Sequence, residues 1–251
     1  MRINILTIFP EMFAPLHGSM IGRAEQQGIL EFRIINIRDY TEDRHNRVDD
    51  TPFGGGAGMV MQVQPILSAV RESGSQGRVL YMSPRGRQLD GALAEELANE
   101  QEITILCGHY EGVDQRALDL LRAEEVTIGD YILTGGELPA MVLIDAVARF
   151  LPGVLAGEES VREESVYSGL LEYPQYTRPR EYEGLEVPEI LLNGNHQMIG
   201  RWRWEQSLRL TKERRPDLFR EYVRKAEADG TLTRKERSLL SEVAEEDPTT
   251  K

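Results

Sequence analysis

The chain has few lysines and a single cysteine, and both shortages exclude whole classes of chemistry. The four lysines are Lys212, Lys225, Lys235 and Lys251. A phosphate-binding P-loop needs a lysine in its glycine-rich loop, and a pyridoxal enzyme needs a Schiff-base lysine, so the glycines of residues 54–58 do not form a P-loop. One cysteine excludes an internal disulfide framework and a multi-cysteine zinc site, and we interpret it as a buried small hydrophobic residue.

Long hydrophobic runs are also missing. No run of about eighteen apolar residues is present that could span a bilayer, and the start of the chain, MRINILTIFPEMF, lacks the basic region and cleavage signature of a secretory signal. We therefore expect a cytoplasmic protein without a membrane partner. The formal net charge of −13 argues against non-specific binding of nucleic acid by the whole surface, so any contact with nucleic acid must be local.

Strand-like and helix-like segments alternate through the first part of the chain, which predicts an α/β fold with a largely parallel sheet. Leu89, Leu93 and Leu97 recur at helical spacing, a further helix is expected to end at Leu121, and Pro139 suits the first turn of a helix that reaches Phe150. The apolar runs that we predict to be strands are residues 2–9, 31–37, 78–83, 103–106 and 126–133.

The character of the sequence changes past Gly153. Residues 156–164 are small or charged and show no periodicity, which is typical of a linker. Beyond about Pro188 the sequence becomes helical, and Thr233 and Glu236 have the spacing of a capping box at the start of a last helix. We divide the chain into a domain of residues 1–160 and a smaller, all-helical domain of residues 171–251, with an interdomain linker at about 154–170.

Three loops follow three of the predicted strands, at residues 83–86, 108–112 and 128–138. The third loop reads TIGDYILTGGELPA from Thr127 and carries two carboxylates, Asp130 and Glu137. Its glycines permit positive φ and a close approach of the backbone to a ligand. Ligands of open α/β sheets bind at the carboxyl ends of strands, so one ligand could contact all three loops. Their backbone groups suit a ligand with an adenine edge and a zwitterionic tail.

Six segments of the chain occur in the same order in a known family of enzymes. These segments are FGGGAGMVM, SPRGR, CGHYEGVDQR, TIGDYILTGGELPAM, GLLEYPQYTRP and NGNHQMIGRWRWEQSL. Over nearly its whole length the sequence resembles bacterial tRNA (guanine-N1)-methyltransferase, the TrmD family of the SPOUT superfamily. The resemblance implies a SPOUT-type parallel sheet with a C-terminal trefoil knot in the first domain, and a homodimer that binds the anticodon stem-loop of tRNA.

The resemblance also implies that S-adenosyl-L-methionine binds against the three loops. The cofactor-binding positions that it assigns are Tyr81, Met82, Ser83, Pro84, Gly86, Gly108, Tyr110, Glu111, Ile128, Gly129, Tyr131, Leu133, Gly135, Gly136 and Pro139. Taken without the resemblance, Tyr131 and Leu133 are equally well explained by core packing. Glu111 matches a carboxylate linked to a magnesium requirement, although alone it would be an ordinary loop acid.

The implied reaction is methylation of N1 of the guanine at position 37 of tRNA, next to the anticodon. Guanine N1 carries a proton, so a carboxylate must accept it while a cation stabilises charge on O6. The resemblance places the base at Glu164, where the family has aspartate, with Glu163 as an alternative and Arg149 as the cation. By composition alone, the two glutamates would be a solvated acidic linker and Arg149 a surface cation.

Other positions depart from the family pattern. His109 replaces the usual arginine, Arg85 stands where glutamine is common, and Ala57 replaces a proline in the glycine loop. The change at His109 puts one basic contact in doubt.

RNA recognition needs a local positive surface, and residues 201–216 hold six basic residues, Lys212 among them, but only two acids. A charged helix face of this kind is often simply solvated. Trp202 and Trp204 could stack on bases, although helical spacing puts them on nearly opposite faces, so one of them is expected in the core. The substrate-binding positions that we predict are Arg44, His45, Asn46, Asp50, Gly54, Gly55, Ser165, Arg201, Arg203, Arg209, Arg214 and Arg215.

Two alternatives stay open at this point. One is a SPOUT methyltransferase that acts on another RNA position. The other is a noncatalytic RNA-binding relative that has kept the fold.

Overall fold

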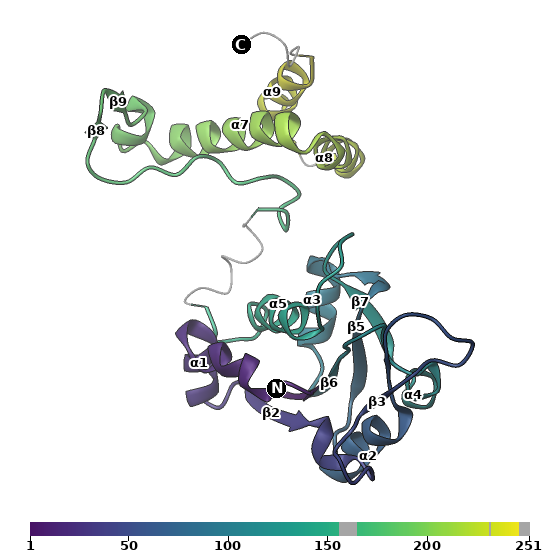
Figure 1. The fold of residues 1–251 in the computed structure, drawn as a ribbon. Coiled ribbons are helices and arrows are strands. Elements are labelled where there is room, and N and C mark those ends of the chain that lie inside the picture. The colour runs from purple at the N-terminus through teal and green to yellow at the C-terminus, as the bar shows by residue number, and fades with distance from the viewer. Residues whose placement is uncertain (156–164, 231, 246–251) are drawn as a thin grey trace. The chain divides into compact units, whose positions relative to one another are not determined.

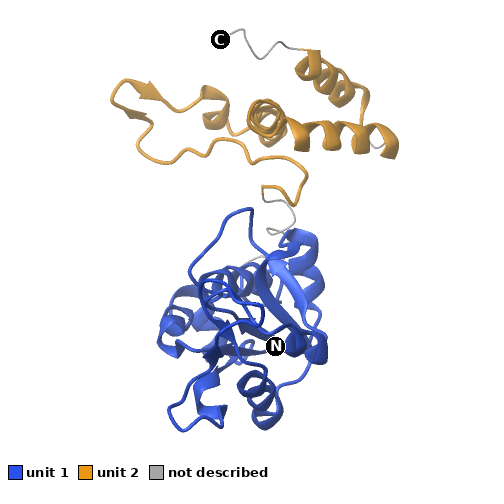
Figure 2. Cartoon of the chain, turned by 45° about the vertical axis from the view of Figure 1, so that its right-hand side comes forward, with its two compact units in different colours: residues 1–158 blue, residues 159–251 orange. Residues whose placement is uncertain are grey.

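The computed structural model of the protein describes residues 1–155, 165–230 and 232–245. The chain divides into two compact units, residues 1–158 and residues 159–251, which Figure 2 shows in blue and orange. Each unit is described by itself below. Among the residues that the structure describes, no helix is both long enough and apolar enough to cross a membrane.

Unit 1 is built on a five-stranded sheet whose order is β2-β1-β6-β5-β7 (Figure 1). Every neighbouring pair in this sheet is parallel, which confirms the prediction of an α/β fold with a parallel sheet. A short antiparallel pair, β3 and β4, stands apart from it. The strands are β1 (Arg2–Thr7), β2 (Glu31–Asn36), β3 (Asp49–Asp50), β4 (Val60–Met61), β5 (Arg78–Gln88), β6 (Glu102–Cys107) and β7 (Glu124–Thr127).

Helices cover both faces of the sheet, so the central strands are buried on both sides. In β1, Ile3 and Ile5 pack into a core cluster with residues of α1, α3 and α5, whereas Leu6 joins a second cluster with α2 and α4. Side chains of a strand alternate between its faces, which is why one apolar run serves both clusters. The helices are η1 (Pro10–His17), α1 (Ser19–Gln26), η2 (Ile37–Tyr40), α2 (Val63–Ser73), α3 (Gly91–Ala98), α4 (Gln115–Leu121) and α5 (Glu137–Ala148).

Two predicted strand ends are wrong. Residues 126–133 were expected to be one strand, but β7 ends at Thr127, where the threonine hydroxyl bonds both the N–H and the carbonyl of Gly129 and turns the chain. Conversely, β5 does not end at Ser83 but continues to Gln88. Val126 pairs with both Met82 and Arg87, so residues 83–86 form a bulge within β5 rather than a loop after it.

Helix boundaries follow local capping more than apolar spacing. Leu89 lies outside α3, because Asp90 caps that helix by accepting a hydrogen bond from the backbone N–H of Leu93 at 2.8 Å. The helix predicted to end at Leu121 is α4, which does end there. Pro139 lies in the first turn of α5, as predicted. The helices α1 and α2 were not predicted.

Unit 2 contains α7 (His196–Arg214), α8 (Pro216–Asp229), α9 (Arg234–Glu245), a 3-10 turn η3 (Glu189–Leu192) and a two-stranded sheet, β8 (Glu181–Tyr182) with β9 (Leu185–Glu186). The expectation of an all-helical second domain is therefore wrong in this detail. Glu183 and Gly184 both have positive φ, 52° and 80°, which is the backbone of a two-residue hairpin. The core of this unit is formed by Leu170, Leu208, Phe219, Leu239, Leu240 and Val243.

The predicted capping box at the start of α9 is confirmed. The Glu236 carboxylate accepts the backbone N–H of Thr233 at 2.8 Å, and the Thr233 hydroxyl accepts the N–H of Glu236 at 3.3 Å. The prediction that one tryptophan packs in the core is also confirmed. Trp204 packs against the unit 2 core and donates its indole N–H to the Tyr222 hydroxyl, whereas Trp202 lies near the ring of Tyr176.

Candidate functional site

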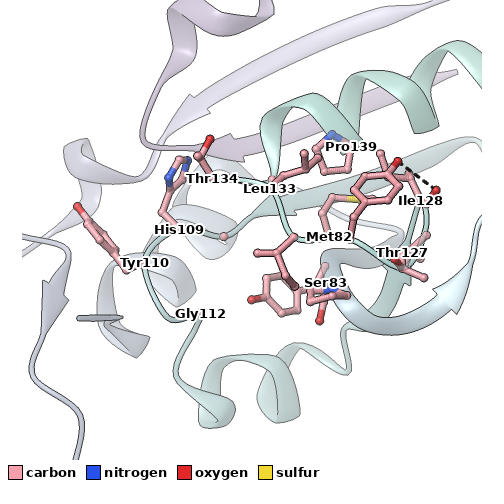
Figure 3. Close-up of a pocket in the computed structure, with 18 of the residues that line it drawn as sticks. Met82, Ser83, His109, Tyr110, Gly112, Thr127, Ile128, Leu133, Thr134 and Pro139 are labelled. Carbon is pink, nitrogen blue, oxygen red and sulfur yellow. Dashed lines mark hydrogen bonds between the residues drawn. The ribbon is translucent and has the colours of Figure 1, made fainter. Parts of the chain in front are cut away.

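A pocket of about 270 Å³ lies at the carboxyl ends of β6 and β7, beside the bulge of β5 (Figure 3). This is slightly below the roughly 300–1,000 Å³ that is usual for ligand pockets. All the residues that the sequence assigned to the cofactor line this pocket, with the exception of Gly86. Residues that the assignment missed, among them His109, Thr127 and Thr134, line it as well. The structure thus brings the three predicted segments together around one cavity.

Gly86 lies apart from the pocket for a packing reason. A Cβ on this residue would stand 2.2 Å from the carbonyl carbon of Glu125, in the backbone of the neighbouring strand β7. The glycine is therefore explained by the close approach of two strands, with no ligand needed.

The second and third segments of the pocket are in direct backbone contact. The N–H of Gly136 donates to the carbonyl of Gly108 at 2.9 Å. A Cβ on Gly136 would stand 2.7 Å from the Cα of Cys107, and no side-chain movement could relieve that contact. Glycine is needed here because two backbones meet, which is the reason for one of the glycines that the sequence singled out.

The first segment is fixed by Glu125 of β7. Its carboxylate accepts a hydrogen bond from the Ser83 hydroxyl and two from the Arg85 guanidinium, at 3.1 and 3.0 Å. Tyr81 is buried beside this segment, and burial, followed by the nearby negative charge of Glu125, raises the pKa of its hydroxyl. Arg85, which replaces a common glutamine, is therefore engaged in holding the bulge.

The second segment contains a strained residue. Tyr110 has φ of 58°, in the left-handed region that a residue with a Cβ rarely adopts, and its side chain is about half exposed. Strain of this kind concentrates at functional sites. The same segment is hydrogen-bonded to the residues that follow the glycine loop, because the N–H of Glu111 donates to the Met59 carbonyl and the N–H of Met61 donates to the Gly112 carbonyl, both at 2.9 Å.

A buried polar cluster beside the pocket was not recognised from the sequence. Glu137 was read as a loop carboxylate, but it is the first residue of α5 and its side chain is only 1% exposed. It accepts hydrogen bonds from the Thr7 hydroxyl at 2.6 Å and from His109 Nε2 at 2.7 Å. The partners are 130 and 28 residues away in the sequence, so no local pattern could have paired them. Asp130, the other carboxylate of that segment, is exposed.

The structure describes only some of the predicted catalytic residues. Glu164 and its alternative Glu163 lie outside the described residues. Arg149 is half-buried at the C-terminal end of α5. Ser165 is described, and its hydroxyl accepts the backbone N–H of Glu172 at 2.8 Å.

The described residues contain no group of three or more histidine, cysteine, aspartate or glutamate side chains that could hold a metal ion. Glu111 lines the pocket as a single carboxylate. Cys107 is free and fully buried, and burial raises the pKa of its thiol well above the usual value. The interpretation of Cys107 as a buried small residue is confirmed.

The residues predicted to lie near the target base occupy one exposed stretch before the glycine loop. Arg44 and His45 contact each other through their side chains at 3.1 Å, and Asn46 has φ of 55°. Asp50 belongs to β3, and Gly54 and Gly55 both have positive φ. Because β4 joins this loop to the second pocket segment, the stretch continues directly into the pocket wall.

The predicted RNA-binding cations of unit 2 differ in how far they are already paired. Arg209 forms an ion pair with Glu205 at 3.0 Å, and Arg215 pairs with Asp217 at 2.6 Å. Arg203 stacks over the ring of Tyr173, and Lys212 donates to the carbonyls of Val243 and Ala244 at the end of α9. Arg201 and Arg214 are exposed, and within the described part of the chain neither forms an ion pair.

Comparison with known proteins gives a consistent result. Residues 1–221 match the family described as tRNA (Guanine-1)-methyltransferase TrmD. Three similar proteins, each named tRNA (guanine-N(1)-)-methyltransferase, come from Alkaliphilus oremlandii, Moorella thermoacetica and Clostridium acetobutylicum. The first is 51% identical over 97% of this chain and 98% of its own length. The second is 53% identical over 97% of both chains, and the third 48% identical over 96% and 97%.

Proposed function

The chain belongs to the TrmD family of tRNA (guanine-1)-methyltransferases, and we propose that it transfers a methyl group from S-adenosyl-L-methionine to N1 of the guanine at position 37 of tRNA. Methylation of guanine N1 in tRNA follows from the family and from the names of its relatives. The methyl donor and the position in the tRNA are the finer parts of the proposal.

The observation that carries the donor assignment is the pocket lined by the three segments. It offers backbone N–H and C=O groups around small residues, and its apolar wall includes Met82, Ile128, Leu133 and Pro139 (Figure 3). A ligand with a flat adenine, a ribose and a zwitterionic tail needs this combination of apolar surface and backbone hydrogen bonds. When bound there, S-adenosylmethionine supplies an activated methyl group on a sulfonium.

The remaining chemistry must come from the protein's own residues. We assign removal of the N1 proton to the Glu164 carboxylate, since guanine N1 becomes nucleophilic only as that proton leaves. We assign stabilisation of the charge that develops on O6 to the Arg149 guanidinium. We assign a magnesium contact to Glu111, because Mg²⁺ is commonly bound through one or two carboxylates and keeps several of its waters.

The assembly and the substrate complete the proposal. Unit 1 would be the knotted donor-binding domain of a cytoplasmic enzyme, and unit 2 would bind the anticodon stem-loop through its basic residues. We further propose a homodimer. Its supporting observation is a set of exposed apolar side chains in the third pocket segment and α5, where Ile132 is 78%, Leu138 50% and Val142 48% exposed. Exposed apolar surface is typical of an interface where such side chains gather.

The test uses tRNA transcripts that carry either guanine or adenine at position 37, incubated with the protein and isotope-labelled methyl donor. We expect label only in the guanine transcript, and we expect the Glu164→Gln variant to bind the donor but not to transfer its methyl group. Ribosomal RNA serves as the competing substrate. Label in ribosomal RNA, or equal label in both transcripts, would overturn the proposed position of methylation.

A further inference from the structure

We propose that His109 and Glu137 are positioning residues that hold the second and third segments of the pocket in the geometry that binds the methyl donor. The inference rests on the proposed function, because it concerns donor binding in the same pocket. It assigns a role to a buried cluster that neither acts on the target base nor forms part of the apolar core.

The cluster links three parts of unit 1 that are distant in the sequence. His109 belongs to the second pocket segment, Glu137 lies at the end of the third, and Thr7 ends β1. The two oxygens of the Glu137 carboxylate are used separately, since Oε2 accepts from His109 Nε2 at 2.7 Å and Oε1 accepts from the Thr7 hydroxyl at 2.6 Å. Thr7 Oγ1 in turn accepts the backbone N–H of Phe9 at 2.9 Å. The carboxylate is therefore held from both sides.

The His109 ring is held on its other side as well. Phe9 meets it edge-on, with 4.9 Å between the ring centroids, and the backbone N–H of His109 points to the Met61 sulfur at 3.3 Å. The imidazole is 13% exposed and the carboxylate 1% exposed, so little water competes for their hydrogen bond. Hydrogen bonds that involve an ionised group in such surroundings are strong and directional.

The pair also supports the backbone of the third segment. A Cβ built on Gly135 would stand 2.3 Å from Cε1 of His109 and 2.6 Å from Oε2 of Glu137, so the Gly135 backbone rests directly on the hydrogen-bonded pair. The next residue, Gly136, donates its N–H to the carbonyl of Gly108. A displacement of His109 would therefore shift both segments that line the pocket.

Burial of the Glu137 carboxylate has an energetic reason. It lies at the first position of α5, where the backbone N–H groups of a helix favour negative charge. The His109 and Thr7 donors satisfy both of its oxygens. Burying a charge this deeply costs a great deal unless each oxygen is hydrogen-bonded, so loss of the histidine leaves a partly unsatisfied buried carboxylate. The pocket segments would be expected to rearrange to let water reach it.

The test compares His109→Ala with His109→Gln, a variant that keeps a donor near the position of Nε2. Binding of S-adenosylhomocysteine is measured by calorimetry without RNA, and the melting temperature is measured on the same samples. We expect His109→Ala to weaken binding about tenfold, the effect of losing one hydrogen bond to a buried charged group. We expect His109→Gln to bind within about threefold of the unchanged protein, because its amide can replace that donor.

A second histidine provides a matched control. His17 contacts Glu25 at the same distance, 2.7 Å, but the pair is exposed and lies outside the pocket lining. His17→Ala should leave ligand affinity unchanged. Thr7→Val tests the Glu137 carboxylate from its other side, because it removes the hydroxyl donor while keeping the side-chain shape. It should weaken ligand binding as well.

The inference is overturned if His109→Ala binds the ligand as tightly as the unchanged protein. It is also overturned if His109→Ala and His109→Gln lose affinity equally while their melting temperatures fall together, because a purely structural role predicts that result. If the unchanged protein methylates tRNA and binds the donor, but His109→Ala and Thr7→Val leave donor affinity unchanged, only this inference is overturned. If the unchanged protein binds no donor, the proposed function is overturned together with this inference.

Discussion

The pocket of unit 1 and the helix α7 of unit 2 are proposed to serve the same reaction, but they are formed by different kinds of groups. The pocket is lined by backbone, glycines and apolar side chains, and a buried carboxylate with two hydrogen-bonding partners lies beside it. The surface of α7 carries several arginines, of which Arg209 is half-buried and paired with Glu205, and Arg215, which follows the helix, is paired with Asp217. A site made of close contacts should fail abruptly when it is changed, whereas a surface made of charges should weaken gradually and depend on salt.

The sharpest form of this comparison uses one substitution in each region, Gly136→Ala and Gly200→Ala. A methyl group at residue 136 would lie 2.7 Å from backbone, whereas one at residue 200 meets nothing within 4 Å. We expect Gly136→Ala to lower the rate of methyl transfer by roughly a hundredfold, through misplacement of the bound donor. Gly200 lies within α7, so Gly200→Ala should stabilise unit 2 by about 0.5–1 kcal/mol.

Transfer of an isotope-labelled methyl group to tRNA would measure the first effect, and thermal unfolding the second. Equal rates of methyl transfer in the two variants would contradict the claim that the pocket depends on contact between two backbones. A loss of stability in Gly200→Ala would show instead that α7 is packed more tightly at that position than the structure indicates.

A smaller effect is expected from the charges of α7. Arg201→Ala and Arg214→Ala remove exposed cations that have no ion pair among the described residues, so each should lower the slope of log affinity for tRNA against log salt by about one. Arg209→Ala also removes the partner of Glu205, and it should change tRNA affinity less than the other two because the pair already compensates its charge. The measurement is tRNA binding over a salt series, with donor affinity as the control that should not change.

The comparison also explains what could be predicted from the sequence. The parallel sheet could be predicted because strands buried on both faces must be nearly continuous apolar runs, as in residues 103–106. The glycine-rich segments could be identified because few other residues tolerate such close backbone contacts. By contrast, the end of β7 depends on a side-chain turn at Thr127, and the hairpin of β8 and β9 depends on positive φ at Glu183. Neither feature could be predicted from the spacing of apolar residues.

Long-range pairing is the other kind of information that the sequence did not give. Glu137 and Thr7 are 130 residues apart, and only the fold brings them together beside the pocket. The acid partners of Arg209 and Arg215 are different, because Glu205 and Asp217 are only four and two residues away, so these pairs could have been recognised from the sequence. The resemblance to a family identified the pocket residues well, but it could not separate Gly86, which packs between strands, from those that line the cavity.

The last effect that we predict concerns stability alone, and it arises in the capping box of α9. Thr233→Ala should destabilise unit 2 by about 1 kcal/mol at neutral pH, the usual effect of losing such a cap. Hydrogen bonds from Thr233 lower the pKa of Glu236 in the folded protein. These hydrogen bonds therefore stabilise the folded protein when the Glu236 carboxylate is ionised. Their stabilisation is fully present above the unfolded pKa, about 4.3, and it is lost as pH falls through the lower folded pKa. The difference in stability between the Thr233→Ala variant and the unchanged protein should therefore become smaller at acidic pH.

Thermal unfolding of the variant and the unchanged protein at neutral and acidic pH would measure this difference. A gap that stays constant with pH would contradict the role of the Glu236 carboxylate. Donor binding should be the same in both proteins, which separates the stability of α9 from the function of the pocket.

The account depends most on the claim that the three segments of unit 1 hold the methyl donor. Determining the structure of the protein with S-adenosylhomocysteine tests it most directly. The account predicts that the ligand occupies the cavity between the β5 bulge, residues 108–112 and residues 128–136, with hydrogen bonds to backbone groups of all three. A ligand bound elsewhere on the chain, or one that contacts only a single segment, would contradict it.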